Sequence, residues 1–477
     1  MTRTVLIVGA GPTGLTLAID LARRGVDVRI VDKATTPFTG SRGDGIQPRT
    51  LEVFDDLGVL DAVLAAGTPT PLMRAYLDGT LVAERRMSES RAASPAVPYP
   101  NPWVLGQSDT ERLLRDRLAE FGVRVEFGTA LAGFTQDADE VRATLTGPGG
   151  TENVAERYLI GADGGAGTVR RTLGIPFEGT TDESIRMLLG DVPVDALDHD
   201  FGYWFATAAT PTAGVALTPL PGGRLFQFAA PLGDDPRPTR AVLQERLDRV
   251  SGRTDLTVGE PVWSTVWRPN IRLAQRFRSG RVFLAGDAAH VHPPTGGQGM
   301  NTGIQDAYNL GWKLAAAVGG DPGPLETYES ERRAVARRVL GLSTALLDKH
   351  LEGHEDAMNR GAETHQLDIS YRDASDAAGL TAGDRAPDAP LQRGDGSALR
   401  LFDLFRGPHA TRLTFGTPAG ISEDAGVRAY SIVAPGYRPE PGQLIAVDGH
   451  AFTDYAATAG TQVLVRPDGY LAWHRQG

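Results

Sequence analysis

The chain has 477 residues, enough for two or three domains, and a formal net charge of −11 without any dense run of Lys and Arg. This charge argues against a nucleic-acid-binding surface, and the absence of Cys excludes disulfides, thiolate metal sites and a cysteinyl-linked cofactor. No apolar run reaches the roughly 18 residues that a membrane span requires. Because a strand is predicted from residue 4 onward, we expect no signal peptide and a cytoplasmic protein.

The first predicted strand runs directly into a glycine-rich turn, GAGPTG at residues 9–14, and then into a helix. In this setting Gly9 permits a tight turn, Gly11 lets the backbone approach a pyrophosphate, and Gly14 lets the helix pack on the strand. Unpaired N–H groups at the start of the helix favour the anion. A second strand ends at Asp32, at the spacing where a carboxylate binds ribose hydroxyls. The opening therefore predicts a dinucleotide site.

Three further segments follow in chain order. A helix is predicted over residues 108–121, and residues 158–175 repeat the pattern of an apolar strand, a glycine-rich turn and a helix. From residue 178 to residue 270, apolar and polar residues alternate between Pro and Gly turns. This alternation predicts an antiparallel sheet that interrupts the first domain.

The most informative segment is residues 282–315, VFLAGDAAHVHPPTGGQGMNTGIQDAYNLGWKLA. An apolar strand ends at Asp287, whose carboxylate would accept hydrogen bonds from ribityl hydroxyls; a turn cap is the alternative role. Met300 and Asn301 stand where the next helix begins, and free N–H groups there would stabilise negative charge on a reduced flavin. Together with the opening turn, this segment predicts bound FAD.

The loop between this strand and this helix is rich in Pro and Gly. Pro293, Gly296, Gly297 and Gly299 would line the edge of the flavin ring, where larger side chains would intrude. His290 stands two residues before another His, a spacing that makes no ligand pair on a helix, so no metal site is predicted. His290 is interpreted as a structural residue rather than a catalytic base.

The end of the chain predicts a separate small α/β unit. It follows a linker-like stretch at residues 383–390 and ends in a hairpin with Pro467-Asp468-Gly469 as its turn. We therefore expect three domains. They are an FAD-binding domain formed by residues 1–177 and 271–382, a middle substrate-binding β domain over 178–270, and a C-terminal domain over 383–477.

Three motifs in order resemble the class A FAD-dependent aromatic hydroxylases, the p-hydroxybenzoate hydroxylase-like superfamily, over essentially the whole chain. They are GAGPTG at 9–14, GADGGAGTVRR at 161–171 and LAGDAAHVHPPTGGQGMN at 284–301. SRGDGIQPRTLEVF at 41–54 and RAPD at 385–388 are similar to the branch with phenol, aromatic-polyketide and rifampicin hydroxylases. The resemblance implies an α/β fold with a Rossmann-like FAD-binding domain, an inserted antiparallel β-sheet domain and a C-terminal thioredoxin-like domain. Without Cys, that last domain would serve packing or dimer contact in a monomer or homodimer.

The resemblance also assigns further site residues. Arg42 matches the arginine near the pyrophosphate and flavin, and Asp44 beside it is polar where relatives are often apolar. Gln107 matches a glutamine on the FAD backbone, Asp163 belongs to a motif used for FAD and the nicotinamide cofactor, and Arg170 would be a phosphate partner there. The predicted cofactor site comprises Gly9, Gly11, Thr13, Gly14, Asp32, Lys33, Arg42, Gln107, Leu131, Asp163, Asp287, Pro293, Gly297, Gly299, Met300 and Asn301.

The reaction implied by the resemblance is a hydroxylation. FAD reduced by NADPH or NADH would react with O2 to give a C4a-hydroperoxide, which would hydroxylate an electron-rich aromatic ring. NAD(P)H would dock in a groove, because the chain has no second GxGxxG unit. Aromatic residues of the middle sheet are candidates for the pocket wall, namely Phe201, Tyr203, Trp204, Phe205, Phe226 and Phe228. Only one face of the sheet can meet the substrate, and no catalytic acid or base is assigned.

Two alternatives remain open at this point. The same cofactor could carry out Baeyer–Villiger insertion or ring opening of an aromatic polyketide. The chain could also be a non-catalytic flavoprotein that binds an aromatic ligand. A flavin halogenase is not favoured, because Trp263 and Trp267 do not form that family's WxWxIP signature.

Overall fold

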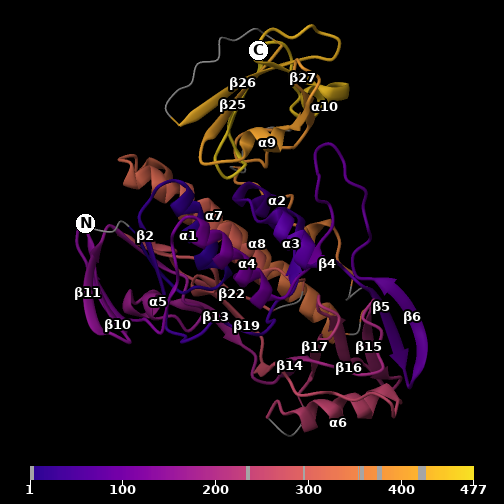
Figure 1. The fold of residues 1–477 in the computed structure, drawn as a ribbon. Helices are drawn as coiled ribbons and strands as arrows, with labels where there is room; N and C mark the ends of the chain where they lie inside the picture. Colours follow the sequence, from indigo (N-terminus) through magenta and orange to yellow (C-terminus); the bar gives the residue numbers. More distant parts are fainter. Residues whose placement is uncertain are drawn as a thin grey trace. The chain divides into compact units, whose positions relative to one another are not determined.

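The computed structural model describes residues 5–232, 237–293, 296–352, 354, 359–372, 379–416 and 426–477. It has a mixed α/β fold, which confirms the predicted class, and it forms two compact units (Figure 1). The first unit comprises Met1–Gln47, Asp61–Glu89 and Pro102–Thr364, and the second comprises Pro48–Leu60, Ser90–Asn101 and His365–Gly477. The three predicted domain boundaries stay a prediction, and Thr4 of the first predicted strand lies outside the described residues.

The first unit contains a six-stranded sheet in the order β20-β21-β12-β1-β2-β8, parallel except between β20 and β21. Val5 stands opposite both Val28 and Tyr158, so the strands that precede Gly9 and Asp163 end at one edge of the sheet. β1 and β12 are buried along their whole length, as expected for strands inside a parallel sheet. The strands are β1 (Val5–Val8), β2 (Val28–Asp32), β8 (Glu126–Phe127), β12 (Tyr158–Gly161), β20 (Arg278–Ser279) and β21 (Val282–Leu284).

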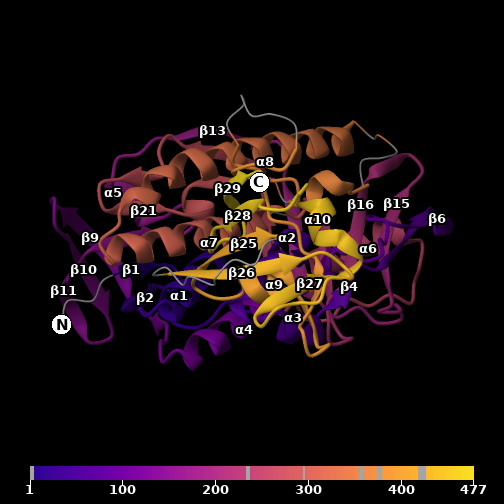
Figure 2. The same cartoon turned by 90° about the horizontal axis from the view of Figure 1, so that it is seen from above.

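Helix α1 (Pro12–Arg23) packs against α7 (Gly299–Val318) through glycines (Figure 2). A Cβ on Gly303 would lie 2.4 Å from Thr13 Oγ1, and a Cβ on Gly311 would lie 2.2 Å from Asp20 Oδ2. The two glycines are about two turns apart and therefore share one face of α7. This close packing brings the first turns of α1 and α7 together.

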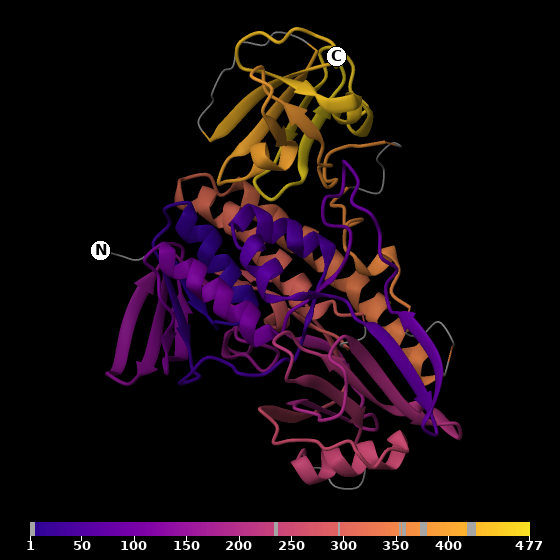
Figure 3. The ribbon, with the colours of Figure 1, turned by 45° about the vertical axis from the view of Figure 1, so that its right-hand side comes forward.

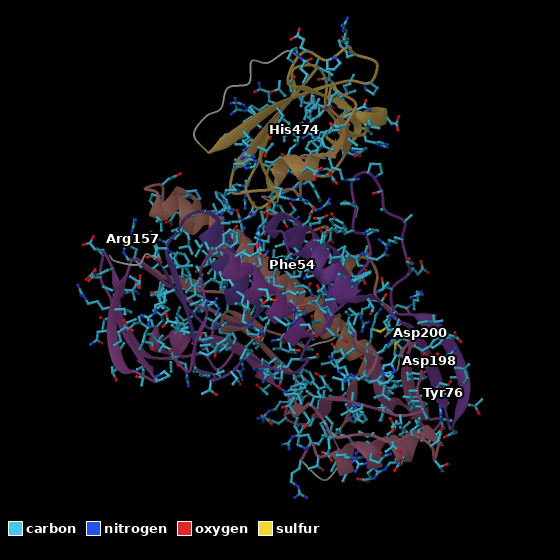
Figure 4. All side chains as sticks on the ribbon, in the orientation of Figure 1. Phe54, Tyr76, Arg157, Asp198, Asp200 and His474 are labelled. Atoms are coloured by element: carbon cyan, nitrogen blue, oxygen red, sulfur yellow. The ribbon has the colours of Figure 1, made fainter. Side chains whose placement is uncertain are left out.

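Other helices of the first unit support this pair. The helix predicted over residues 108–121 is confirmed as α4 (Gln107–Glu120), which packs on α1, and α8 (Tyr328–Leu351) packs on α7. Arg157, labelled in Figure 4, donates from Nη1 to the carbonyl oxygen of Val318 at 2.9 Å and so stabilises the end of α7. Apart from α6, the other helices that the structure describes in this unit are α3 (Leu60–Ala66), α5 (Thr168–Thr172), η1 (Gly286–Ala288), η2 (Gly323–Thr327) and η3 (Ala362–Thr364).

A seven-stranded sheet of the first unit has the order β18-β14-β17-β16-β15-β5-β6 (Figure 3). All neighbours are antiparallel except β5 and β15. Helix α6 (Arg240–Ser251) packs on it; Thr239 caps the start of α6, and Gly252 ends it with a φ of 65°. The strands are β5 (Leu72–Leu77), β6 (Thr80–Arg86), β14 (Met187–Val192), β15 (Phe201–Thr207), β16 (Thr210–Pro219), β17 (Phe226–Pro231) and β18 (Trp263–Trp267).

Three small antiparallel sheets complete the first unit. They are β9 (Ala130–Gln136) with β10 (Val141–Gly147) and β11 (Gly150–Glu156); β13 (Phe177–Thr181) with β19 (Asn270–Ala274) and β22 (His290–Val291); and β3 (Gly45–Ile46) with β7 (Trp103–Val104) and β4 (Thr68–Pro69). The third of these sheets carries the residues that follow Arg42, so it positions part of the candidate site.

The second unit contains a seven-stranded sheet in the order β24-β23-β27-β26-β25-β28-β29. Its apolar core includes Leu413, Phe415, Ile432 and Tyr455. The predicted C-terminal hairpin is confirmed: β28 pairs with β29, and Gly469 in its turn has a φ of 78°. The elements are α2 (Pro48–Leu57), α9 (Leu401–Phe405), η4 (Val447–Gly449), α10 (His450–Asp454), β23 (Pro390–Gln392), β24 (Ala398–Arg400), β25 (Ala410–Phe415), β26 (Val427–Val433), β27 (Gln443–Ala446), β28 (Gln462–Val465) and β29 (Leu471–Arg475).

Candidate cofactor and substrate site

The first glycine-rich turn has the geometry of a dinucleotide-binding turn. Gly9 has a φ of 107°, and a Cβ there would lie 2.2 Å from the carbonyl oxygen of Ala162, so only glycine fits. A Cβ on Gly14 would lie 2.0 Å from the carbonyl oxygen of Gly9, which shows how closely α1 lies against the turn. A Cβ on Gly11 would meet no atom within 4 Å. The backbone of Gly11 therefore faces open space, where a pyrophosphate can approach.

The start of α1 leaves backbone donors unpaired. The first hydrogen bond of this helix runs from the N–H of Leu15 to the carbonyl oxygen of Gly11 at 3.0 Å. Among the described residues, no acceptor pairs with the N–H groups of Thr13 and Gly14. Unpaired donors at a helix N-terminus, together with the helix dipole, favour an anion at this position.

Asp32 holds the turn from the end of β2. Its Oδ2 accepts the N–H of Ala10 at 2.8 Å, and its Oδ1 accepts the N–H of Ala34 at 2.8 Å. The side chain remains partly exposed. Each carboxylate oxygen has a further lone pair, so Asp32 can fasten the turn and still accept a ribose hydroxyl.

In the second glycine-rich turn, after β12, polar side chains form hydrogen bonds with the backbone of the same segment. Asp163 Oδ2 accepts the N–H of Val169 in α5 at 3.0 Å, and burial raises the pKa of this carboxyl. Arg170 is buried and donates to the carbonyl oxygens of Gly165 at 3.0 Å and Ile175 at 3.4 Å. These contacts favour a structural role for Arg170 over the phosphate contact that the resemblance implies.

Helix α7 supplies a second set of unpaired donors. Its first described hydrogen bond from a main-chain donor is that of Thr302 to the carbonyl oxygen of Gln298 at 2.9 Å. In the described part of the chain, the N–H groups of Met300 and Asn301 have no acceptor. The N-terminus of α7 can therefore stabilise negative charge beside it, as the sequence predicts for the reduced flavin.

The strand that was predicted to end at Asp287 is β21, which ends at Leu284, and Asp287 lies three residues further on in η1. Its side chain is exposed, yet protein surrounds it closely enough for desolvation to raise the pKa of its carboxyl. The two observations agree if Asp287 is reachable by solvent from one side only. Nearby His290 and Arg42 act electrostatically against this rise in pKa, so Arg42 is within electrostatic range of Asp287.

Asn301 joins the two loops of the site. Its Nδ2 donates to the carbonyl oxygens of Gly45 and Gly297, both at 2.8 Å, and its Oδ1 accepts the N–H of Gln47 at 2.8 Å. The side chain of Gln47 also donates to the carbonyl oxygen of Gly296 at 3.3 Å. Asn301 is fully buried, so these bonds fix the position of the segment that follows Arg42.

Arg42 is an exposed cation without a carboxylate partner among the described residues. Its guanidinium lies 5.0 Å from the centre of the Phe38 ring. Glu111 of α4 is buried beside it, and burial raises the pKa of Glu111 to about 7, with Asp32 and Arg42 both in electrostatic range. Gln107 donates from Nε2 to Glu111 Oε1 at 2.8 Å. Arg42, Asp32, Gln107 and Asp287 are thus neighbours of one site.

A buried charged network lies behind η1 and α7. Asp306 Oδ2 lies 2.7 Å from His290 Nε2 and accepts the N–H of Gly286 at 3.0 Å. Asp306 Oδ1 accepts from Arg332 Nε at 2.7 Å. Burial alone would raise the pKa of Asp306, but Arg332 and His290 together hold it below its usual range. This network supports the structural interpretation of His290.

The seven-stranded sheet has two different faces. Tyr203, Phe205, Phe226 and Phe228 lie in the apolar core that includes Leu243 and Leu247 of α6. Tyr76, labelled in Figure 4, stacks on Phe205 with ring centres 5.1 Å apart. This placement favours a packing role for these four residues over the predicted contact with a substrate. Their aromatic character does not indicate which face of the sheet α6 covers.

The other face of this sheet is partly exposed and meets the Arg42 segment. Trp204 stands opposite Ala216, which stands opposite Ala229. Two residues before Ala229 on β17, Gln227 stands opposite Asp191 and donates from Nε2 to the carbonyl oxygen of Ser41 at 2.7 Å. Burial raises the pKa of Asp191 to about 6. This partly exposed face, which we call the open face, is the surface on which a substrate could lie.

The remaining predicted residues have simpler surroundings. Lys33 is exposed, Leu131 is buried in β9, and Pro293 is buried in the loop before the undescribed residues 294–295. Gly297 has a φ of 63°, and a Cβ on Gly299 would lie 3.6 Å from the His292 ring. Their contacts with a cofactor stay a prediction.

The sequence did not single out three residues of this site. The one sequence signal for Glu111 is its place one helical turn after Gln107. Asp191 and Gln227 stand at strand positions that no sequence motif marks. No group of three His, Cys, Asp or Glu side chains within the described ranges could hold a metal ion. Within the same ranges, no helix is long and apolar enough to cross a membrane.

The first unit thus has the features of a dinucleotide-binding protein: a mainly parallel sheet with two glycine-rich turns, and two helix N-termini that favour an anion. Residues 2–343 match the family described as FAD binding domain, and residues 380–477 match the family described as aromatic-ring hydroxylase, C-terminal. The chain belongs to the family of FAD-dependent aromatic-ring hydroxylases and binds FAD.

Individual relatives agree with this assignment. A flavin-dependent monooxygenase of Mycobacteroides abscessus is 44% identical, over 98% of this chain and 96% of the relative. The 6-methylpretetramide 4-monooxygenase of Streptomyces rimosus is 36% identical, over 98% of this chain and 90% of the relative. The structure of aklavinone-11 hydroxylase with FAD and aklavinone matches with a TM-score of 0.83 and 29% identity, over 99% of this chain and 95% of that chain.

Proposed function

We propose that this protein is a monooxygenase that uses FAD, NADPH or NADH, and O2 to hydroxylate an aromatic ring. One observation carries the proposal: the N-termini of α1 and α7 both have unpaired N–H groups and meet where Thr13 lies against Gly303. The pyrophosphate and the reduced flavin ring are the two anionic parts of FAD. A pair of adjacent anion-favouring sites suits one molecule that carries both.

The donor set of the site fits FAD. Gly11 and the N-terminus of α1 would bind the pyrophosphate, and Asp32 would accept from a ribose hydroxyl. Asp287 would accept from the ribityl chain, and the N–H groups of Met300 and Asn301 would stabilise charge on the ring. Arg42 has no carboxylate partner among the described residues and would supply the positive charge near the pyrophosphate.

When bound and reduced by NADPH or NADH, FAD would activate O2, so that one of its oxygen atoms enters the substrate ring and the other leaves as water. The chain's own residues would orient the ring on the open face of the seven-stranded sheet. Trp204 offers a large apolar surface there, and Ala216 and Ala229 leave room beside it. Relatives that act on 6-methylpretetramide and aklavinone favour a polycyclic aromatic polyketide as the substrate class.

The proposal includes the domain roles expected from the sequence. Residues 1–177 and 271–382 would bind FAD, residues 178–270 would contribute the substrate sheet, and residues 383–477 would form a thioredoxin-like domain without thiol chemistry. β5 and β6 belong to the same sheet as β15, so residues 72–86 would share the substrate role.

A screen for substrate-stimulated oxidation of NADPH and NADH tests the function. We expect purified protein to release FAD on denaturation and to oxidise the nicotinamide slowly alone but much faster with a phenol or polyketide substrate. Arg42→Ala should slow flavin reduction more than it weakens substrate binding, because it removes the cation beside the cofactor. If no aromatic compound stimulates nicotinamide oxidation, the alternative of a non-catalytic flavoprotein that binds an aromatic ligand would be favoured. Product NMR would distinguish hydroxylation from Baeyer–Villiger insertion or ring opening.

A further inference from the structure

The RAPD motif at residues 385–388 has no part in the proposed FAD site, yet Arg385 makes a set of buried contacts in the second unit. Its side chain is 8% exposed, and that of its partner Glu52 is 2% exposed. Arg385 Nε donates to Glu52 Oε2 at 2.8 Å, and Arg385 Nη2 pairs with Glu52 Oε1. Arg385 Nη2 also donates to the carbonyl oxygen of Ala96 at 3.0 Å. One guanidinium therefore joins helix α2 to the segment Ser90–Asn101.

Helix α2 is held by other residues of the C-terminal sequence along the same face. Arg49 Nη2 donates to the carbonyl oxygen of Asp468 at 2.8 Å, and Asp56 Oδ1 accepts the N–H of Gly407 at 2.7 Å. Arg49, Glu52 and Asp56 are three and four residues apart, which places them on one side of the helix. Burial alone would raise the pKa of Glu52, but Arg385 and Arg49 hold it below its usual range.

Both segments that Arg385 joins continue directly into the site. Helix α2 begins at Pro48, the residue after Gln47, whose N–H is bonded to Asn301. The segment Ser90–Asn101 ends two residues before Trp103, with which β7 begins, and only Pro102 lies between them. β7 pairs with β3, Gly45 opposite Val104. Each strand of the β3–β7 pair is thus continuous with a segment bonded to Arg385: β3 leads into α2, and residues 90–101 lead into β7.

We propose that Arg385 is a positioning residue for the cofactor: by joining Glu52 and Ala96, it fixes both continuations of the β3–β7 pair and so holds residues 43–47 in the conformation that binds FAD. The constraint acts through the chain, across the peptide bond from Gln47 to Pro48. Gly43 and Gly45 have open space at their Cβ positions, so side-chain packing at these two residues adds nothing to the restraints from β7 and Asn301. This gives the cysteine-free C-terminal sequence a role in cofactor binding, and it rests on the proposed FAD site.

Arg385→Gln tests the proposal in the full-length protein. Arg372→Gln is the matched control, because Arg372 belongs to the same unit and pairs with Asp384, whereas Arg385 pairs with Glu52 of α2. Hydrogen exchange of the FAD-free protein should become faster at the amides of Gly45, Ile46 and Gln47 in Arg385→Gln but not in Arg372→Gln. FAD titration should show about tenfold weaker binding for Arg385→Gln only.

Two further variants keep the test decisive if Arg385→Gln does not fold. Arg385→Lys retains the charge but not the paired geometry and should bind FAD with intermediate affinity. Glu52→Gln should weaken FAD binding in the same way, and the double variant should show a non-additive effect. Faster exchange in α2 with unchanged exchange at residues 45–47 and unchanged FAD affinity would overturn the inference. Wild-type protein that binds no FAD would instead overturn the proposed function, while the exchange experiment would still decide the positioning role.

Discussion

The side-chain oxygen of Asn301 accepts the backbone N–H of Gln47 at 2.8 Å, although the two residues are 254 positions apart in the sequence. The same side chain donates to Gly45 and Gly297, so one buried amide ties the segment after Arg42 to the loop before α7. An amide suits this position because it both donates and accepts. Asn301 therefore fixes residues 45–47 against the loop before α7 through its side chain, while the contact of its N–H with the cofactor stays a prediction.

Asn301→Ala should destabilise the FAD-free protein by about 2–4 kcal/mol, because three hydrogen bonds are lost and their buried partners stay unpaired. FAD binding should weaken by about tenfold or more. Urea unfolding and FAD titration measure the two effects. Asn153→Ala is the control, since Asn153 is exposed on β11 and its side chain accepts a hydrogen bond from Thr144. Equal stability of both variants would show that the Asn301 contacts are dispensable.

Asp287→Ala should weaken FAD binding by about tenfold with little change in the stability of the FAD-free protein. The reason is that the exposed Asp287 side chain has no hydrogen-bond partner among the described residues, so its acceptors would serve the ribityl chain. Retention of FAD during dialysis gives the readout, with the exposed Asp139→Ala as the control. Full retention of FAD by Asp287→Ala would place the ribityl chain elsewhere.

Glu111→Gln should change how stability depends on pH. Burial raises the pKa of Glu111 from 4.5 to about 7 in the folded protein. The folded state then binds the proton more tightly than the unfolded state, so this stabilisation is full below about pH 4.5 and is lost as pH rises through about 7. FAD-free wild type should therefore lose up to about 3 kcal/mol relative to Glu111→Gln between pH 4.5 and pH 8. A stability difference that stays constant with pH in urea unfolding would contradict this.

Substitutions on the two faces of the seven-stranded sheet should separate packing from substrate binding. Phe228→Ala should destabilise the protein by about 3–5 kcal/mol, because it opens a cavity in the core under α6. Trp204→Ala, on the open face, should cost far less stability and should mainly raise the KM for the aromatic substrate. Thermal unfolding and steady-state kinetics provide the comparison. A KM that changes more in Phe228→Ala than in Trp204→Ala would reverse the assignment of the two faces.

Local patterns were predictable from the sequence, and contacts between distant segments were not. The strand before Gly9 and the hairpin turn at Gly469 follow from apolar runs and turn residues close together in the chain. The sequence did not predict Glu111 as a site residue, because its raised pKa arises from burial by tertiary packing. Alternation along β15 indicated two faces but not which of them α6 covers.

In the second unit, too, the contacts between distant segments could not be predicted from the sequence. Helix α2 belongs to it although fewer than fifty residues precede that helix in the chain, and its partner Arg385 is more than three hundred residues away. Charges at Arg49, Glu52 and Asp56 look like an ordinary solvated helix face when the sequence is considered alone. Only the folded structure shows that this face is buried and paired.

Incorporation of isotopic oxygen is the most direct test of the proposed function. With an aromatic substrate that stimulates NADPH or NADH oxidation, the reaction is run under ¹⁸O2 in ordinary water, and the product is analysed by mass spectrometry and NMR. The proposed function predicts one ¹⁸O atom per product molecule, in a new ring hydroxyl group. Product oxygen derived from water, or nicotinamide oxidation that yields only hydrogen peroxide with every stimulating aromatic compound, would contradict it.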